Sequence, residues 1–394
     1  MMFKNHRILR LWPLLLGLTL GGCDGCSSRN ALAPEEEYPG SVSGYIYVVG
    51  SRDHSHVLVF LGDNFLETKE SDGPGTFTNR EGYYNITNVF SGTYTLYAQK
   101  GDLKESWPNI KVGWEETKVP DIYLLRARLP LSAGNLWEYD LREWLDEATI
   151  ARGQRKVNIQ GQEVLAGVAT SVIEELTYRE STQGNREQTL EKKWLYETKD
   201  GLFEYASETI YNVNAAAVSP ARNPSSEKKP HFRLGNLYFS DLAQLRQFVN
   251  NLVPAYDKRS GPIKNTPNIH LYPQKILAYP VRLRESWTYE LLPPSEDPSP
   301  ITKEVVAQDR IFTPAGEFVC YKIKVTYDFD PEIVIEAYEW YSHIGLVKFY
   351  RKTEFWETED YDPQSDLREE KKRIWIESWE LNYYRLTDLP DEPT

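Results

Sequence analysis

Tyr321-Lys322-Ile323-Lys324-Val325-Thr326-Tyr327 alternates aromatic or aliphatic side chains with charged or polar ones. Successive side chains of a β-strand point to opposite faces of its sheet, so this stretch predicts a strand with one buried face and one wet face. The stretch from Arg373 to Leu381 repeats the pattern. Further strands are predicted at residues 137–141, 188–196, 282–291, 333–341 and 345–356. We therefore expect a large curved antiparallel sheet, or half-barrel, in a domain spanning residues 129–388.

One helix is predicted to pack into the concave side of this sheet. Its apolar face is formed by residues three or four positions apart, namely Leu242, Leu245, Phe248, Val249 and Leu252. Ser240 can cap the start of the helix, and Pro254 can stop it.

A short motif occurs twice in this region. Leu129-Pro130-Leu131 precedes Trp137-Glu138-Tyr139, and Tyr279-Pro280-Val281 precedes Trp287-Thr288-Tyr289 with the same internal spacing. Because only a few residue types match, we interpret the echo as a chance similarity. Duplication of a half-unit is the alternative.

Residues 41–125 show shorter apolar runs, and turn-forming Gly, Asn and Asp separate them. The runs are Val42–Val49, Val57–Leu61, Tyr83–Ile86 and Thr93–Ala98. Short strands at close intervals predict a small antiparallel β-sandwich. The whole chain is 13% aromatic, with 26 Tyr and only 2 Met, which favours strands over helices and an all-β fold.

Both regions resemble known domain families. Val42-Ser43-Gly44, Gly82-Tyr83 and Gly92-Thr93-Tyr94 resemble the carboxypeptidase regulatory-like domain, a transthyretin-like β-sandwich, which implies a non-catalytic accessory domain. Pro314–Lys322 and Gly345–Lys348 resemble an uncharacterised β-rich domain of bacterial envelope lipoproteins. That second resemblance implies a location and a fold more than an activity.

The first 22 residues have the pattern of a secretory signal peptide. Lys4, Arg7 and Arg10 give a positive start, and the apolar run from Leu11 to Leu20 follows them. That run is too short to cross a bilayer, which takes a helix of roughly 20 residues. Cleavage is therefore expected after Gly22.

Leu20-Gly21-Gly22-Cys23 resembles the lipobox of bacterial lipoproteins. The resemblance implies that Cys23 is acylated, palmitate being one expected acyl group, and that residues 23–40 form a lipidated tether. The partner would be a membrane, outer or inner, on a face outside the cytoplasm. More than one acyl chain anchors a protein stably, whereas one chain binds only marginally. An ordinary secreted protein with a chance cysteine is the alternative.

The remaining composition excludes two classes of protein. Cys26 and Cys320 are the only other cysteines, so a disulfide scaffold is excluded, and Cys320 in its apolar run is expected to be buried. The net charge is −13, and loss of the basic signal peptide leaves the mature chain more negative still. Such a chain repels phosphate backbones, so nucleic acid is not an expected partner.

No familiar catalytic or cofactor motif is present, and we expect no catalytic site, metal or cofactor. His54 and His56 could share a metal, but solvated loop histidines are the default interpretation. Asp328, Asp330 and Glu332 could bind calcium, but an acidic turn is the simpler interpretation. The acidic stretch Glu357–Glu370, with Asp360, Asp362 and Asp366, is interpreted in the same way.

The sequence therefore predicts a lipid-anchored envelope protein that binds or scaffolds rather than catalyses, with an envelope protein or a glycan as its partner. Tryptophans are abundant, at 11 in the chain, and most should be core residues. The first alternative is a carrier or receptor that binds a hydrophobic ligand or glycan on a concave, aromatic-lined sheet. The second is an envelope hydrolase with paired carboxylates, which leave no sequence signature.

Overall fold

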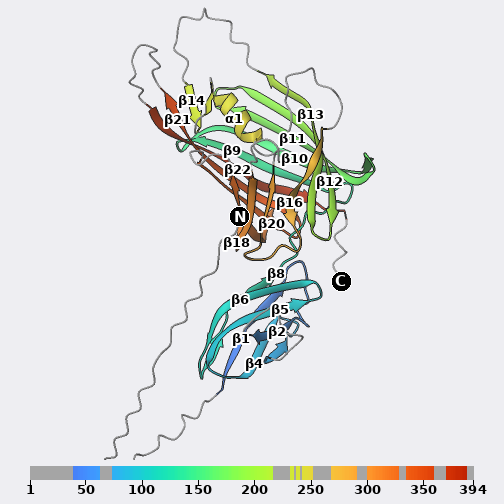
Figure 1. Cartoon of the computed structure of the whole chain (residues 1–394), viewed down its shortest axis with the longest axis vertical. Coiled ribbons are helices and arrows are strands. Elements are labelled where there is room, and N and C mark those ends of the chain that lie inside the picture. The colour runs from blue at the N-terminus through green and yellow to red at the C-terminus, as the bar shows by residue number, and fades with distance from the viewer. Residues whose placement is uncertain are drawn as a thin grey trace, which may run out of the picture. The chain divides into compact units, whose positions relative to one another are not determined.

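The structure is a computed structural model that describes residues 39–62, 73–215, 231–234, 237–239, 242–251, 268–290, 300–327, 334–358 and 370–387. Within these residues the chain is built of strands, with one α-helix (Figure 1). The predicted all-β fold class is therefore confirmed.

Residues 40–124 form a sandwich of two four-stranded sheets. The first sheet contains β1 (Gly40–Val48), β4 (Tyr83–Val89), β7 (Glu116–Lys118) and β8 (Ile122–Leu124). The second contains β2 (Leu58–Gly62), β3 (Gly75–Phe77), β5 (Gly92–Lys100) and β6 (Leu103–Val112). Alternate side chains of the two sheets meet in one buried core, which includes Val42, Ile46, Val59, Ile86 and Leu96.

The first sheet of the sandwich is mixed rather than purely antiparallel. β1 pairs antiparallel with β4, but β7 and β8 run parallel to it. The reason is the path of the chain, because β6 belongs to the other sheet and the chain crosses over before it returns beside β1. A parallel pair requires such a crossover, whereas an antiparallel pair can be joined by a tight turn.

Residues 136–385 form the large sheet, whose main path contains twelve antiparallel strands. The strands are β9 (Leu136–Leu145), β10 (Ala148–Leu165), β11 (Val168–Ser181), β12 (Arg186–Thr198), β13 (Gly201–Ala215), β16 (Asn268–Ala278), β17 (Ser286–Glu290), β18 (Pro300–Thr313), β19 (Gly316–Tyr327), β20 (Val334–Ser342), β21 (Gly345–Thr358) and β22 (Glu370–Arg385). A short hairpin, β14 (His231–Leu234) with β15 (Leu237–Phe239), pairs with β21. Figure 1 shows the main sheet curving strongly, so that it has an inner and an outer face.

The predicted helix is confirmed as α1 (Leu242–Asn251), while Ser240, Leu252 and Pro254 lie outside the described residues. Leu245 and Val249 are buried against Phe355 and Trp375 of the large sheet. Arg351 of β21 donates a hydrogen bond to the carbonyl of Val249, with an Nη1 to O distance of 3.2 Å. The helix therefore packs on the inner face, as the sequence predicts.

The large sheet consists of two halves with the same topology. The first half contains β9–β13 and β16, the second contains β17–β22, and each is an antiparallel run of six strands. β9, which opens the first half, pairs with β22, which closes the second. At the other junction Trp287 and Lys303 donate side-chain hydrogen bonds to β16, to the carbonyls of Lys275 and Ile276, both at 3.1 Å.

The turns that lead into the two halves also match. Gly134 donates its N–H to the carbonyl of Ile159, and Arg284 donates its N–H to the carbonyl of Val305, both at 2.8 Å. Gly134 and Arg284 both have a positive φ, 87° and 67°. A register shift follows Ile159 in β10 and Val305 in β18.

The tryptophan that follows each of these turns points its indole N–H at the opposite half. Trp137 Nε1 donates to the carbonyl of Ile344 at 2.7 Å, and Trp287 Nε1 donates to the carbonyl of Lys275 at 3.1 Å. The repeated sequence motif is therefore a structural repeat, and its interpretation as a chance similarity is wrong. Three matching residue types were too few to reveal a repeat that lies in the backbone hydrogen bonds.

We predict that Trp137→Phe and Trp287→Phe each lower the free energy of unfolding by about 1–3 kcal/mol, because each leaves a buried carbonyl without its donor. Trp114→Phe is the matched control, since Trp114 is 77% exposed, and should change stability by less than about 0.5 kcal/mol. Urea unfolding of the three variants measures this. Equal stability of all three would contradict the proposed role of the two indoles.

Candidate functional site

Most of the residues singled out from the sequence do not form a site in the described part of the chain. Cys23 and Cys26 lie outside the described residues. So do Asp328, Asp330 and Glu332, and the acidic residues Asp360, Asp362 and Asp366. Cys320 is fully buried, as predicted, and burial together with Asp309 raises the pKa of its thiol.

The two neighbouring histidines do not come together around a metal position. His54 Nδ1 accepts a hydrogen bond from the backbone N–H of Val48 at 3.1 Å, and burial and Lys100 lower the pKa of His54. Within the described residues no group of three or more His, Cys, Asp or Glu side chains is placed to hold a metal ion.

Most of the tryptophans belong to the core, as the sequence predicts. Trp137, Trp194 and Trp375 are at most 1% exposed, and Trp287 and Trp340 are also buried. Four others are half-buried, namely Trp107, Trp144, Trp356 and Trp379, and the side chain of Trp114 is 77% exposed. These buried tryptophans are therefore not left open for a ligand.

Paired charges form a buried cluster on the inner face beneath α1. Arg179 connects two buried carboxylates, with Nε 2.8 Å from Glu143 Oε1 and Nη2 3.0 Å from Glu377 Oε1. Arg246 of α1 lies 3.1 Å from Glu143, and Arg351 binds Glu377. The cluster attaches the helix to β9, β11, β21 and β22 through side chains that are nearly or wholly removed from solvent.

A second charged cluster lies beside the first. Arg155 and Lys193 lie 2.5 and 3.0 Å from Glu175, and the Arg155 guanidinium stacks 3.9 Å from the ring centre of Trp379. Burial alone would raise the pKa of Glu175, but Arg155 and Lys193 outweigh it and lower that pKa to about 2. Glu175 is therefore held ionised.

These carboxylates do not provide the pair that glycoside hydrolysis requires. That chemistry needs one carboxyl to be protonated near neutral pH, so that it can act as a general acid. Burial would raise the pKa of Glu377, but Arg351 and Arg179 lower it well below its usual range. Because Glu175 and Glu377 both stay ionised, we assign the clusters a structural role.

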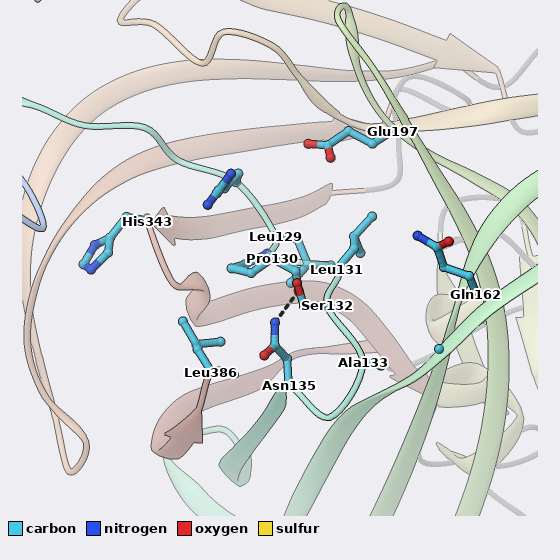
Figure 2. Close-up of a pocket in the computed structure, with 12 residues that line it drawn as sticks. Leu129, Pro130, Leu131, Ser132, Ala133, Asn135, Gln162, Glu197, His343 and Leu386 are labelled. Carbon is cyan, nitrogen blue, oxygen red and sulfur yellow. Dashed lines mark hydrogen bonds between the residues drawn. The ribbon is translucent and has the colours of Figure 1, made fainter. Parts of the chain in front are cut away.

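A pocket of about 470 Å³ lies where the chain enters the large sheet (Figure 2). Leu129, Pro130, Leu131 and Leu386 supply its apolar lining. Figure 2 shows the run from Leu129 to Leu131 at the centre, with His343 and Leu386 on one side and Glu197 and Gln162 on the other. The pocket therefore combines apolar and polar groups in about equal measure.

The backbone of the pocket is held in place by Asn135. Its side-chain Nδ2 donates to the carbonyl of Pro130 at 3.2 Å. Its Oδ1 accepts hydrogen bonds from the N–H and the hydroxyl of Thr387, at 2.7 and 3.0 Å. These bonds connect the turn before β9 to the segment after β22, so the pocket is preformed.

Charges of both signs surround the pocket. Arg128 is exposed on its rim, and burial and Arg128 together lower the pKa of His343. Glu197 is also exposed, and burial and Glu197 raise the pKa of the neighbouring Tyr279 hydroxyl. With His343 neutral, the rim offers one cation and one anion.

In the second half of the large sheet, the surface that corresponds to the pocket contacts the sandwich. Gln162 follows Ile159 by three residues, and Gln308 follows Val305 by three. Gln308 Nε2 donates to the carbonyl of Tyr123 at 2.9 Å. Because of the repeat, this surface occurs once in each half of the large sheet. In the second half it contacts the sandwich, which belongs to the same chain.

Glu105 of the sandwich is the buried acid in that contact region. Tyr321 donates its hydroxyl to Glu105, which is 6% exposed. Burial raises the pKa of Glu105 to about 7, although the Tyr321 hydrogen bond and Arg282 both lower it.

Comparisons with known proteins place these features in no family. No family model matches the chain, and no curated protein matches it. The chain is similar to a presumed lipoprotein of Parabacteroides distasonis at 12% identity, over 66% of this chain and 99% of the other, with a TM-score of 0.23. It is similar to a presumed exported protein with a YmcC-like fold from Bacteroides fragilis at 13% identity, over 66% and 100% of the two chains, with a TM-score of 0.24.

Part of the chain is also similar to a cohesin–X-dockerin complex of Acetivibrio cellulolyticus. The identity is 21% over 22% of this chain, which spans 58% of the other, and the TM-score is 0.18. No helix in the described residues is both long enough and apolar enough to span a membrane.

The charged clusters and the pocket were missed by sequence reasoning. A usable signal existed for Glu143, because it follows Trp137, Tyr139 and Leu141 at even spacing and must share their buried face. No such signal exists for the pocket, since its lining comes from five separate parts of the chain.

A third buried ion pair provides a test of the energetics of the inner face. Lys303 lies 2.7 Å from Glu339, and their side chains are 4% and 15% exposed. We predict that Lys303→Met alone destabilises the fold by about 3–5 kcal/mol, because it leaves Glu339 buried and unpaired. The double variant Lys303→Met, Glu339→Met should recover most of that loss in thermal unfolding, and a merely additive double variant would refute this view.

Glu105 predicts a dependence of stability on pH. Because its pKa is higher in the folded chain than the usual 4.5, ionisation disfavours folding, so the free energy of unfolding should fall as pH rises from 4.5 to about 7. The loss attributable to Glu105 is at most about 3 kcal/mol. Glu105→Gln should remove it, so this variant should gain stability over the wild type between pH 5 and 8. A constant difference over that range would contradict the shift.

Proposed function

We propose that the chain is a lipid-anchored, non-catalytic binding protein of the cell envelope. The support for the anchor lies in the sequence, where a basic start and a short apolar run lead to Leu20-Gly21-Gly22-Cys23. Acylation of Cys23 would hold residues 39–394 at the surface of the outer or the inner membrane, outside the cytoplasm.

The observation that carries the binding role is the preformed pocket at the turn into the first half. Its apolar lining stays accessible, and its polar rim contains Arg128 and Glu197. The corresponding surface of the second half already makes a docking contact through Gln308. In the second half this surface binds the sandwich through the carbonyl of Tyr123. In the first half the same surface is well suited to bind a separate molecule.

The lining indicates the chemical class of ligand. Leu129, Leu131 and Leu386 can cover an apolar portion of a few carbon atoms, and Arg128 can bind an anionic group on the rim. We therefore propose a small amphiphilic molecule with one negative charge. This pocket replaces the concave aromatic face as the binding site, because the aromatic side chains of that face are largely buried.

The anchor is tested by metabolic labelling with palmitate in a bacterial host. Wild type and Cys26→Ser should incorporate the label and sediment with membranes, whereas Cys23→Ser should do neither. Label that persists in Cys23→Ser would overturn the assignment of the anchor.

The pocket is tested with 8-anilinonaphthalene-1-sulfonate, an amphiphilic anion whose fluorescence rises in apolar surroundings. Arg128→Gln should raise its Kd by about fivefold, the size expected for the loss of one exposed charge contact. Arg126→Gln is the matched control, because Arg126 is also exposed and lies two residues earlier. Equal Kd values for the two variants would refute binding at this pocket.

Leu131→Ser provides a second variant that does not alter charge. It should weaken binding of the same probe by shortening the apolar lining, while thermal unfolding checks that the fold remains intact. Binding that is unchanged in a folded Leu131→Ser variant would place the ligand elsewhere.

A further inference from the structure

Two exposed aromatic side chains lie at the end of the sandwich where β1 begins. Phe90, in the turn between β4 and β5, is 58% exposed, and Trp114, between β6 and β7, is 77% exposed. Large aromatic side chains gain free energy by leaving water, so two of them exposed at one end of a small domain are a candidate interaction surface.

Strand register places both turns beside the first residue of β1. Gly40 pairs with Val89, the residue before Phe90. A Cβ on Gly40 would lie 2.1 Å from the carbonyl oxygen of Gly113, the residue before Trp114. Only glycine fits there, so the chain enters the sandwich directly between the two aromatic turns.

The turns are held in shape and carry balanced charge. The hydroxyl of Tyr94 donates a hydrogen bond to the carbonyl oxygen of Phe90, 3.0 Å away, and this bond holds the turn that contains Phe90. Around Trp114 the sequence from Lys111 to Lys118 contains two lysines and two glutamates. A surface of this composition does not select for strongly charged partners.

The chain before Gly40 sets the distance from this surface to the anchor. Asp24 to Pro39 is 16 residues, which span at most about 55 Å when fully extended. Two aromatic side chains alone would bind a bilayer weakly. If Cys23 is anchored, the short segment after it raises the effective concentration of membrane at this end of the sandwich. Weak contacts of Phe90 and Trp114 with lipid are then populated.

We infer that Phe90 and Trp114 insert into the headgroup region of the membrane that holds Cys23. Trp is enriched at that depth, where its ring lies in apolar surroundings and its N–H stays hydrated. This inference rests on the proposed anchor at Cys23, because the anchor brings the lipid surface to this end of the sandwich. The balanced charge implies that a zwitterionic surface is sufficient.

The test supplies the anchor chemically, so that it does not depend on acylation in the cell. The chain from Cys23 onward, with Cys26→Ser, is coupled through the Cys23 thiol to a maleimide phospholipid in phosphatidylcholine vesicles. Cys320 is fully buried and should not react. Hydrogen–deuterium exchange is then compared between the coupled chain and the same chain free in solution.

On vesicles, amides of residues 90–92 and 113–116 should exchange about tenfold more slowly than in solution. The double variant Phe90→Ala, Trp114→Ala should remain coupled to the vesicles yet lose this protection. Phe77→Ala is the matched control, since Phe77 is 61% exposed but its strand neighbours, Leu58 and then Gln99, lie near the far end of β5. It should keep the protection.

Unchanged exchange of the coupled wild-type chain on vesicles would overturn the inference, as would protection that survives in the double variant. Neither result bears on the palmitate labelling of Cys23. A failure of the anchor and a failure of the aromatic contact are therefore told apart.

Discussion

The large sheet depends on pairing the charges that it buries beneath α1 and around Glu175. A curved sheet of twelve strands must fill that face, and besides apolar side chains this chain fills it with Glu143, Glu175 and Glu377, which bind arginines and a lysine from other strands and from α1. Removal of an ion from water costs several kcal/mol, and a partner at hydrogen-bond distance offsets that cost only in good geometry. The partners are far apart in sequence, as in the contact between Arg179 and Glu377, so the ion pairs form only when distant strands are in the correct register. The clusters therefore specify the order of the strands as much as they stabilise it.

The two-fold repeat explains how one architecture acquires two different surfaces. Each half begins with the same turn, shown by the matched bonds of Gly134 and Arg284, and continues to a tryptophan that binds the opposite half. The side chains at these turns differ, however. The second half carries Arg282 and Gln308 next to the sandwich, whereas the first carries the leucine-lined pocket. The two halves thus share the backbone geometry of the turn, whereas the exposed side chains around the turn differ between them.

Strand alternation carried most of the information that the sequence holds about this fold. It located seven strands of the large sheet, including β19, in which Tyr321, Ile323, Val325 and Tyr327 occupy every second position. It failed for β13 and β16, and for β10, β11 and β18, in which neighbouring charged residues occupy both faces, as in Arg155-Lys156 of β10. Arg155 belongs to the buried network and Lys156 to the surface, and composition alone cannot separate them. The pocket was beyond reach for a related reason, since Leu131 and Leu386 meet only through the closure of β9 on β22.

The inferred membrane contact would give the sandwich a physical role of its own. A spacer domain would place polar side chains at the end where β1 begins, as solubility demands, yet this chain places Phe90 and Trp114 there. Exposed aromatic residues at that end are unfavourable for a freely diffusing domain and favourable for one that is held near a bilayer. Contact at two turns, added to a covalent anchor, would also restrict the tilt of the sandwich, which an anchor alone leaves free. A restricted sandwich, joined to the large sheet through Gln308 and Tyr321, would present the pocket in a defined direction relative to the membrane.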